Sequence, residues 1–282
     1  MKKFLNVLAV GLLSMVMLTG CGSSDDSGSS ASSNGSDVSG KVVLNGSTSM
    51  ETLSSAFIEV FADINPNIQV TAEFTGSSAG IESLSTGMAD IGNASRALKN
   101  EELAVGIIEN IVAMDGIAII VDPANEIDSL TMDELVDIYE GNITNWSELG
   151  GVDMGIVVIG RESGSGTRSA FEEILGISNP AYAQEIDSTG AVVGKVETTP
   201  ATIGYVSLDV LEDSSAKTLA LEGVQPSIAN IKNNSYSLAR PFVMATNGEI
   251  NEQTPAVQEF FEFIDSSEGQ EIIELVGLVS LK

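Results

Sequence analysis

The segment at Arg161–Arg168, RESGSGTR, combines two arginines, three hydroxyl side chains and two glycines. It lies between an apolar run, GIVVIG, and an amphipathic run, SAFEEIL, so it predicts a junction from a strand to a helix. The first turn of a helix presents unpaired N–H groups and a positive dipole end, and arginine binds oxyanions through two parallel hydrogen bonds. These residues therefore indicate an anion-binding loop. We expect Arg161 to be the ligand and Arg168 to pair with Glu172, four residues along the helix.

Two further junctions combine glycine with hydroxyl residues. NGSTSM at Asn45–Met50 follows the apolar run KVVL, and TGSSAG at Thr75–Gly80 follows VTAEF. Each precedes a helical pattern, so each predicts a helix N-terminus that presents unpaired N–H groups. Ser and Thr are also the usual N-cap residues, and glycine is a common turn residue, so an ordinary structural role explains each junction singly. The three together, with Arg161, favour one anion site built mainly from neutral groups.

The acidic composition restricts which partners the protein can have. The 282 residues include 40 acidic and 12 basic side chains, a formal net charge of −28. This balance excludes nucleic acid as a broad-surface partner, because backbone phosphates need a basic footprint. The chain has no histidine and one cysteine, which excludes Ser-His-Asp catalysis, imidazole metal ligation and an internal disulfide. We expect no metal and no cofactor.

Three other functions compete with anion binding. A P-loop nucleotide site requires a lysine after its last glycine, whereas GRESGSGTR has Thr167 and Arg168 there. A hydrolase with Ser165 as nucleophile would need a lysine or carboxylate base, and no Ser-x-x-Lys pattern includes Ser165. A surface adhesin or scaffold would have no small-molecule ligand. The residues favour a binding protein that is not an enzyme.

The N-terminus has the pattern of an export signal. Two lysines precede an apolar stretch over residues 4–18 that is too short for a comfortable membrane span. The segment Leu18–Cys21, LTGC, has the form of a lipobox, which predicts removal of residues 1–20 and acylation of Cys21. An uncleaved anchor with an incidental cysteine is the alternative, and both place the folded part outside the cytoplasmic membrane. Residues 21–40 are predicted to be the lipidated cysteine and a flexible linker rich in Ser and Gly.

From Lys41, short apolar runs alternate with helical periodicity, the pattern of an α/β protein. Strands are predicted in KVVLNG, NIQVTAEFTG, ADIGNASR, IVAMDGIAIIVDP, GIVVIG, TTPATIGYVSLDV and PFVMATNG. Helices are predicted in METLSSAFIEVFADINP, AGIESLSTGMA, residues 101–109, SLTMDELVDIYEG, residues 167–175 and TPAVQEFFEFIDSSEGQEIIELVG. In the last of these, Phe260, Phe261, Phe263 and Ile264 are expected on the core face.

Two long apolar runs, near residues 111–121 and 240–246, enclose a self-contained α/β stretch. Strands that cross twice between lobes would give a two-lobed protein with a cleft, where small ligands usually bind. We therefore expect a first lobe of residues 41–116 and 243–282, and a second lobe of residues 117–242.

Taken together, these motifs resemble the phosphate-binding proteins of phosphate-specific ABC importers, the PstS family. The resemblance runs from about Val42 to the C-terminus, through GSTSM, GSSAGIESLSTGMADIGNASR, ITNWSELGG, RESGSGTRSAFEE and TIGYVSLD. It implies a type II periplasmic-binding-protein fold, with two α/β lobes that close over one dehydrated phosphate. It also implies a lipid-anchored monomer whose partners are inorganic phosphate and ABC importer permease subunits with a cytoplasmic ATPase.

The resemblance also indicates which residues contact phosphate. They are Ser47, Thr48, Ser49, Ser77, Ser78, Ser95, Arg161, Ser165, Gly166 and Thr167. Some relatives have an aspartate where Ser95 stands before Arg96, and that carboxylate accepts a hydrogen bond from the proton of phosphate and so rejects fully ionised sulfate. A hydroxyl donates or accepts, and does not exclude sulfate by repulsion. Glu162 and Asp90 are candidates for the missing acceptor, with ordinary surface and turn roles as the alternative.

Overall fold

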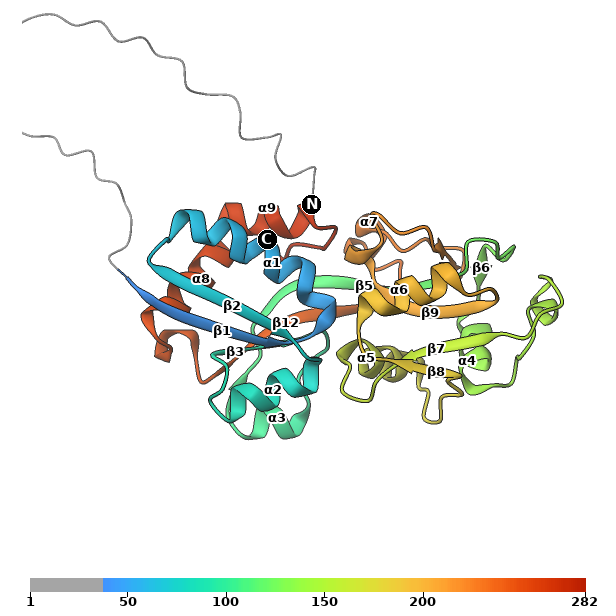
Figure 1. Cartoon of the computed structure of the whole chain (residues 1–282), viewed down its shortest axis with the longest axis horizontal. Helices are drawn as coiled ribbons and strands as arrows, with labels where there is room; N and C mark the ends of the chain where they lie inside the picture. Colours follow the sequence, from blue (N-terminus) through green and yellow to red (C-terminus); the bar gives the residue numbers. More distant parts are fainter. Residues whose placement is uncertain (1–37) are drawn as a thin grey trace, which may run out of the picture. The chain divides into compact units, whose positions relative to one another are not determined.

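Residues 38–282 are described by the structure, which is a computed structural model (Figure 1). The predicted signal sequence, the predicted lipidation site Cys21 and most of the predicted linker lie outside the described residues. The fold begins before Lys41, because Val38 packs against the first hydrophobic core and Gly40 is the first residue of a strand. No helix within residues 38–282 is both long enough and apolar enough to cross a membrane.

Ten strands of the described residues form one mixed sheet, whose central order is β2-β1-β3-β12-β5-β9-β7-β8. They are β1 (Gly40–Gly46), β2 (Ile68–Phe74), β3 (Ile91–Ala94), β4 (Ile107–Ile108), β5 (Ile111–Val121), β7 (Val157–Arg161), β8 (Gln184–Ile186), β9 (Thr202–Ser207), β10 (Lys217–Thr218) and β12 (Ala239–Asn247). Strand β1 is parallel to β2 and β3, and β7 is parallel to β8 and β9. The strands β5 and β12 are antiparallel to their neighbours. A second sheet pairs β6 (Ser129–Leu130) with β11 (Ala220–Leu221).

The main sheet is shared by two lobes, which β5 and β12 connect (Figure 1). The first lobe carries α1 (Glu51–Ile64), α2 (Ser77–Ser85), α3 (Asn100–Ala104), α8 (Pro255–Asp265) and α9 (Ser267–Leu275). The second lobe carries α4 (Met132–Glu140), α5 (Gly166–Leu175), α6 (Thr189–Thr198) and α7 (Ile228–Lys232). Short 3-10 helices are η2 (Thr48–Met50), η3 (Trp146–Leu149), η4 (Leu208–Val210) and η5 (Ile250–Glu252). The predicted α/β class and two-lobed architecture are confirmed.

Each lobe has its own hydrophobic core. In the first lobe α1 and α8 meet through aromatic rings: Phe61 lies edge-on to Phe260 at 5.1 Å between centroids, and Phe57 lies edge-on to Phe263 at 6.0 Å. The predicted core face of α8 is confirmed, since its four apolar residues are all buried. The second core surrounds the fully buried Trp146. Along the chain, the first core contributes buried residues as far as Ala113, and the second core contributes them from Ile117 to Leu238. The first core contributes buried residues again from Phe242.

Helix α4 illustrates how local sequence sets an element's ends. The Thr131 side chain accepts a hydrogen bond from Glu134 N at 3.2 Å, and the Glu134 carboxylate accepts one from Thr131 N at 2.8 Å. This reciprocal capping box satisfies two N–H groups that the helix leaves unpaired. Gly141 ends the helix with φ of 79°, a conformation that glycine adopts without steric cost. The predicted end at Gly141 is confirmed, whereas the helix begins at Met132 because Ser129 and Leu130, which were included in the prediction, form β6.

The prediction of a helix over residues 101–109 is wrong at its C-terminal half. Helix α3 ends at Ala104, and Gly106 follows with φ of 92°. Ile107 and Ile108 then form β4, which pairs antiparallel with Asn247 and Thr246 of β12. Gly106 ends the helical backbone, and the two isoleucines that follow therefore pack against β12 as a short strand.

Candidate anion-binding site

Five loops at the carboxyl ends of parallel strands build the site. In the first lobe they follow β1, β2 and β3, and in the second lobe they follow β7 and β8. Loops at this end of parallel strands are the usual ligand position in α/β proteins. All ten predicted site residues lie at four of these junctions, either in the loop, at the end of the strand before it or in the first turn of the helix after it. Eight of their nine side chains are buried, and so is Gly166; only Ser78, which lies at the rim, is half-buried.

Hydroxyl groups from the two lobes contact one another directly. Ser49 Oγ lies 2.8 Å from Thr167 Oγ1 and 2.8 Å from Thr189 Oγ1, and Thr48 Oγ1 lies 3.1 Å from Thr189 Oγ1. Thr48 and Ser49 belong to the first lobe, whereas Thr167 and Thr189 lie in the first turns of α5 and α6 of the second. We call these four residues together with Arg161 the hydroxyl cage. The cage is therefore an interface between the lobes.

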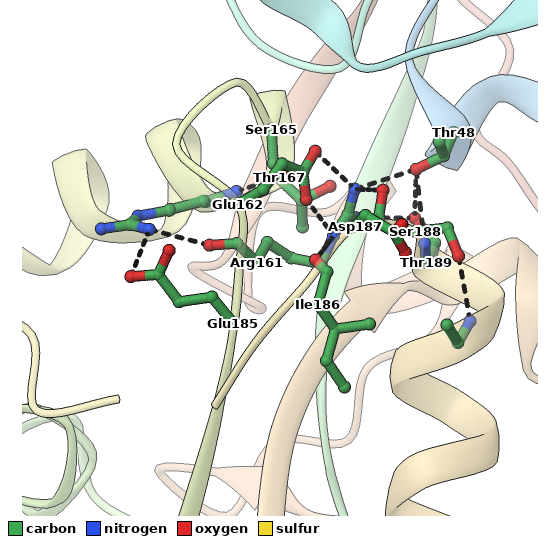
Figure 2. Close-up of polar contacts among 12 residues, drawn as sticks. Thr48, Arg161, Glu162, Ser165, Thr167, Glu185, Ile186, Asp187, Ser188 and Thr189 are labelled. Carbon is green, nitrogen blue, oxygen red and sulfur yellow. Dashed lines mark hydrogen bonds and ion pairs between the residues drawn. The ribbon is translucent and has the colours of Figure 1, made fainter. Parts of the chain in front are cut away.

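Arg161 supplies the cationic group of the hydroxyl cage (Figure 2). Its guanidinium is buried and donates from Nη1 to Thr189 Oγ1 at 2.9 Å and from Nη2 to Thr48 Oγ1 at 3.0 Å. The Nε atom donates to Ile186 O at 3.0 Å and to Glu162 Oε2 at 3.0 Å. The guanidinium is thus held on one edge by the chain after β8 and directs its other edge at hydroxyls from both lobes, as a bidentate oxyanion ligand requires.

Each acceptor acid suggested by the sequence is already engaged elsewhere than with the hydroxyls of the cage. Both Glu162 oxygens accept from Arg161, at 3.0 Å from Nε and 3.1 Å from Nη2. Burial raises the pKa of Glu162, and the adjacent guanidinium opposes that rise. The Asp90 carboxylate instead accepts a hydrogen bond from Val43 N at 2.8 Å, which makes it a structural residue beside β1. In this arrangement Asp90 has a strand-supporting role and Glu162 has the role of Arg161's partner.

A polar and aromatic network supports Arg161 from behind. Arg161 N donates to the Tyr205 hydroxyl at 3.2 Å, and the Tyr205 and Tyr182 hydroxyls lie 3.0 Å apart. Burial raises the pKa of Tyr205 to about 12, so its hydroxyl stays protonated at neutral pH. Arg168 pairs with Glu172 at 2.8 Å, as predicted, and also donates to Arg161 O at 2.8 Å. Arg168 therefore braces the loop that holds Arg161.

Three more of the predicted residues, Ser47, Ser77 and Ser95, form a serine cluster beside the hydroxyl cage. Ser47 Oγ donates to Ser95 Oγ at 2.8 Å, and Ser77 Oγ lies 3.4 Å from Ser95 Oγ. Gly166 of the second lobe packs so tightly here that a Cβ atom on it would lie 2.2 Å from Ser77 Oγ and 2.8 Å from Ser95 Oγ. Only glycine fits at this approach of the two lobes. Arg96, next to Ser95, pairs with Glu102 at 2.7 Å.

Ordinary capping explains some of the predicted hydroxyls and not others. Ser47 and Ser165 cap helices, since their side chains accept from Ser49 N and Arg168 N. By contrast, α2 has no side-chain cap, and the hydroxyl of Ser77 accepts from Ser95 N at 3.1 Å. The cage hydroxyls bond across the lobes. Capping therefore explains Ser47 and Ser165, but it does not explain Ser77 or the cage hydroxyls.

Sequence reasoning missed Thr189. Its side chain is buried and lies within hydrogen-bond distance of three members of the hydroxyl cage. It begins α6, whose N-cap Ser188 accepts from Ala191 N. The segment Ser188-Thr-Gly190 has the same hydroxyl and glycine composition as the three predicted junctions, and this was the signal that could have found it.

Comparisons with known proteins agree on one family. A family profile described as a PBP superfamily domain matches residues 31–268. The chain is 31% identical to phosphate-binding protein PstS of Borreliella burgdorferi, over 86% of this chain and 90% of that protein. It is also 31% identical to phosphate-binding protein PstS of Bacillus subtilis, over 97% of this chain and 92% of that protein.

Solved structures give the same result. A Clostridium perfringens structure assigned as a phosphate ABC transporter substrate-binding protein, with bound phosphate, matches with a TM-score of 0.82 and 38% identity, covering 86% of this chain and 100% of that one. An ABC-type phosphate transport receptor from Vibrio cholerae matches with a TM-score of 0.71 and 31% identity, covering 84% of this chain and 99% of that one. The chain therefore belongs to the PstS family of phosphate-binding proteins, within the PBP superfamily.

Proposed function

We propose that this protein captures inorganic phosphate outside the cytoplasmic membrane and delivers it to an ABC importer permease that a cytoplasmic ATPase drives. The observation that carries the proposal is the buried Arg161 guanidinium, which bonds a hydroxyl from each lobe. The names of the PstS relatives and the phosphate-bound Clostridium perfringens structure support phosphate as the anion. The acidic surface does not oppose this, because the cage groups act over a few ångströms while charges beyond a Debye length of about 8 Å are screened.

The proposed phosphate contacts are the ten predicted residues and Thr189. In the present arrangement the hydroxyls of Ser49, Thr167 and Thr189 bond to one another. A phosphate placed among them would exchange each bond between two hydroxyls for bonds from those hydroxyls to phosphate oxygens. Because these bonds join the lobes, binding requires the lobes to part and then close around the anion. The strands β5 and β12, which connect the lobes, are where that motion would be accommodated.

We further propose that the protein binds phosphate and has no hydrolase activity. The Ser165 hydroxyl is buried and accepts from Arg168 N as a helix cap, and the chain has no histidine to act as its base. Incubation with a chromogenic phosphate ester tests this directly. Turnover that a Ser165→Ala substitution abolishes would replace the binding proposal with a hydrolase.

We also propose the anchoring and the lobe division. Acylation at Cys21 would tether a monomer to the outer face of the cell membrane. We propose that the chain passes from the first lobe to the second between Ala113 and Ile117 on β5. It returns to the first lobe between Leu238 and Phe242 at β12, because the buried residues change from one core to the other at these two places. The second change comes slightly before the boundary of 242/243 expected from the sequence.

Calorimetric titration of the full chain with inorganic phosphate, sulfate and arsenate tests the proposed function. We expect saturable phosphate binding at micromolar protein, with little loss of affinity between low and moderate salt because the site is buried. The absence of heat with every anion would favour a scaffold. Tighter binding of sulfate than of phosphate would assign a different oxyanion to the same cage.

Replacing Thr189 with valine is expected to weaken phosphate binding by about 1 to 3 kcal/mol, the cost of losing one buried hydrogen bond to a charged group. Valine keeps the branched shape but removes the oxygen that accepts from Arg161 Nη1. Thr198→Val is the matched control, since Thr198 is exposed at the other end of α6 and bonds only to backbone oxygens of its own helix. Equal affinities of the two variants would remove Thr189 from the site.

A further inference from the structure

A second buried arginine lies on the strands that connect the lobes. Arg240 of β12 stands directly opposite Asp115 of β5 in the antiparallel register. Its Nε donates to Asp115 Oδ2 at 2.9 Å, its Nη2 lies 2.8 Å from the same oxygen, and neither side chain is more than 1% exposed. Asp115 also accepts from Leu208 N of the second lobe at 3.2 Å. The ion pair therefore joins the two crossing strands to η4.

Arg240 also reaches the serine cluster of the first lobe. Its Nη1 donates to Ser95 O at 3.0 Å, while Ser95 N donates to Ser77 Oγ at 3.1 Å. Both backbone polar groups of Ser95 are thereby fixed, and its hydroxyl is held between Ser47 and Ser77. One guanidinium thus connects the crossing strands with a proposed phosphate contact.

A second carboxylate, that of Asp209, makes the net charge around Arg240 and Asp115 depend on whether Asp209 is protonated. Burial, and next the negative charge of Asp115, raise the pKa of Asp209 to about 8. Neither Asp209 oxygen has a partner in ordinary hydrogen-bond geometry among the described residues, although the hydroxyls of Ser207 and Thr52 are near enough to favour its ionised form. Burial also raises the pKa of Asp115, which Arg240 opposes. One arginine cannot neutralise two buried carboxylates, so one of them is kept protonated.

We propose that Arg240 is a positioning residue for the phosphate site, which holds Ser95 in the serine cluster as long as Asp209 remains neutral. The inference rests on the proposed function. Ionisation of Asp209 adds a second negative charge beside a guanidinium that already makes two contacts, the pairing with Asp115 that links β12 to β5 and the bond to Ser95 O. The other charged or titratable groups that act on the cluster are Arg161, which repels Arg240, and Tyr236, which faces Asp115. Stronger attraction to the carboxylates would withdraw Nη1 from Ser95.

Phosphate titrations of the full chain from about pH 6 to about pH 9.5, with wild type, Asp209→Asn and Arg240→Lys, test the inference. Phosphate ionisation is common to all three proteins, so it cancels in the ratio of their dissociation constants at each pH. We expect wild type and Asp209→Asn to bind equally at the acid end, and wild type to become at least roughly threefold weaker than Asp209→Asn at the alkaline end. Arg240→Lys is expected to bind at least roughly tenfold more weakly at every pH, because lysine offers a single donor point.

Parallel pH profiles for wild type and Asp209→Asn, or wild-type affinity in Arg240→Lys, would overturn the inference. If Arg240→Lys does not fold, the comparison of wild type with Asp209→Asn decides alone, since asparagine preserves the shape of the carboxylate. Thermal unfolding without phosphate separates this result from the proposed function. The stability that protonated Asp209 contributes is complete below about pH 4, declines as pH rises and is lost once pH passes about 8, so wild type should lose stability relative to Asp209→Asn across that window. That loss without any phosphate binding would contradict the proposed function and leave the proton site standing.

Discussion

Replacing Arg161 with lysine is expected to weaken phosphate binding by about 1.5 to 3 kcal/mol, which is roughly a tenfold to more than hundredfold loss of affinity. Lysine keeps the positive charge, so the change isolates the geometry of the guanidinium. Arg161 donates from Nη1 to Thr189 and from Nη2 to Thr48 while Nε is held by Ile186 O. A single ammonium group does not reproduce this fork. Calorimetric titration with phosphate measures the loss.

Arg168→Lys is the matched control for this substitution. Arg168 lies seven residues along the same segment, is partly exposed, pairs with Glu172 and Glu185, and reaches the hydroxyl cage only through the backbone oxygen of Arg161. Lysine keeps a positive charge beside the two acids and a donor for that oxygen, so phosphate affinity is expected to change by less than about 0.5 kcal/mol. A larger loss in Arg168→Lys than in Arg161→Lys would show that the cationic ligand had been assigned to the wrong arginine.

The parts of the site that the sequence predicts are those in which the signal is local. Glycine next to serine or threonine after an apolar run marks a strand, a turn and a helix start within ten residues, and that was enough to find Thr48, Ser77 and Thr167. Arg161 followed because it ends such a strand. Their convergence on one cage depends on the strand order. The strands β1, β2 and β3 run parallel in the first lobe and β7 runs opposite to them in the second, so that their carboxyl ends face each other and the loops that follow meet at the cage.

The parts that the sequence did not predict depend on weak elements or on distant pairs. Thr189 was missed because no apolar run precedes it in the sequence. The strand before it, β8, has only three residues, and none of them is fully buried. Arg240 looks like the polar start of a strand until β5 is placed beside it, since its partner Asp115 lies 125 residues away. The distinction between capping and ligand-facing hydroxyls likewise requires the three-dimensional partners. Ser165 and Ser77 occupy similar sequence contexts, but Ser165 accepts from Arg168 N in its own helix whereas Ser77 accepts from Ser95 N in another loop.

Replacing Gly166 with alanine is expected to weaken phosphate binding by at least about 1.4 kcal/mol, or tenfold, with little change in stability without phosphate. Gly166 starts α5 and does not have a positive φ, so alanine suits its backbone and favours the helix by about 0.5 to 1 kcal/mol. The new Cβ would lie 2.2 Å from Ser77 Oγ, which is far inside van der Waals contact. Because Ser77 belongs to the first lobe and Gly166 to the second, the clash arises only when the lobes close.

The same loop contains the control that separates closure from folding. Gly164 also lacks a positive φ, and a Cβ on it would meet nothing closer than Ser78 Cβ at 4.0 Å. Gly164→Ala therefore makes the same chemical change two residues away without a clash, and its phosphate affinity is expected to stay within about threefold of wild type. Phosphate titration and thermal unfolding of both variants give a clear decision. If Gly166→Ala binds phosphate as wild type does, the contact of Gly166 with the serine cluster is not part of the bound state, and closure over phosphate must follow a different path from the one these loops describe.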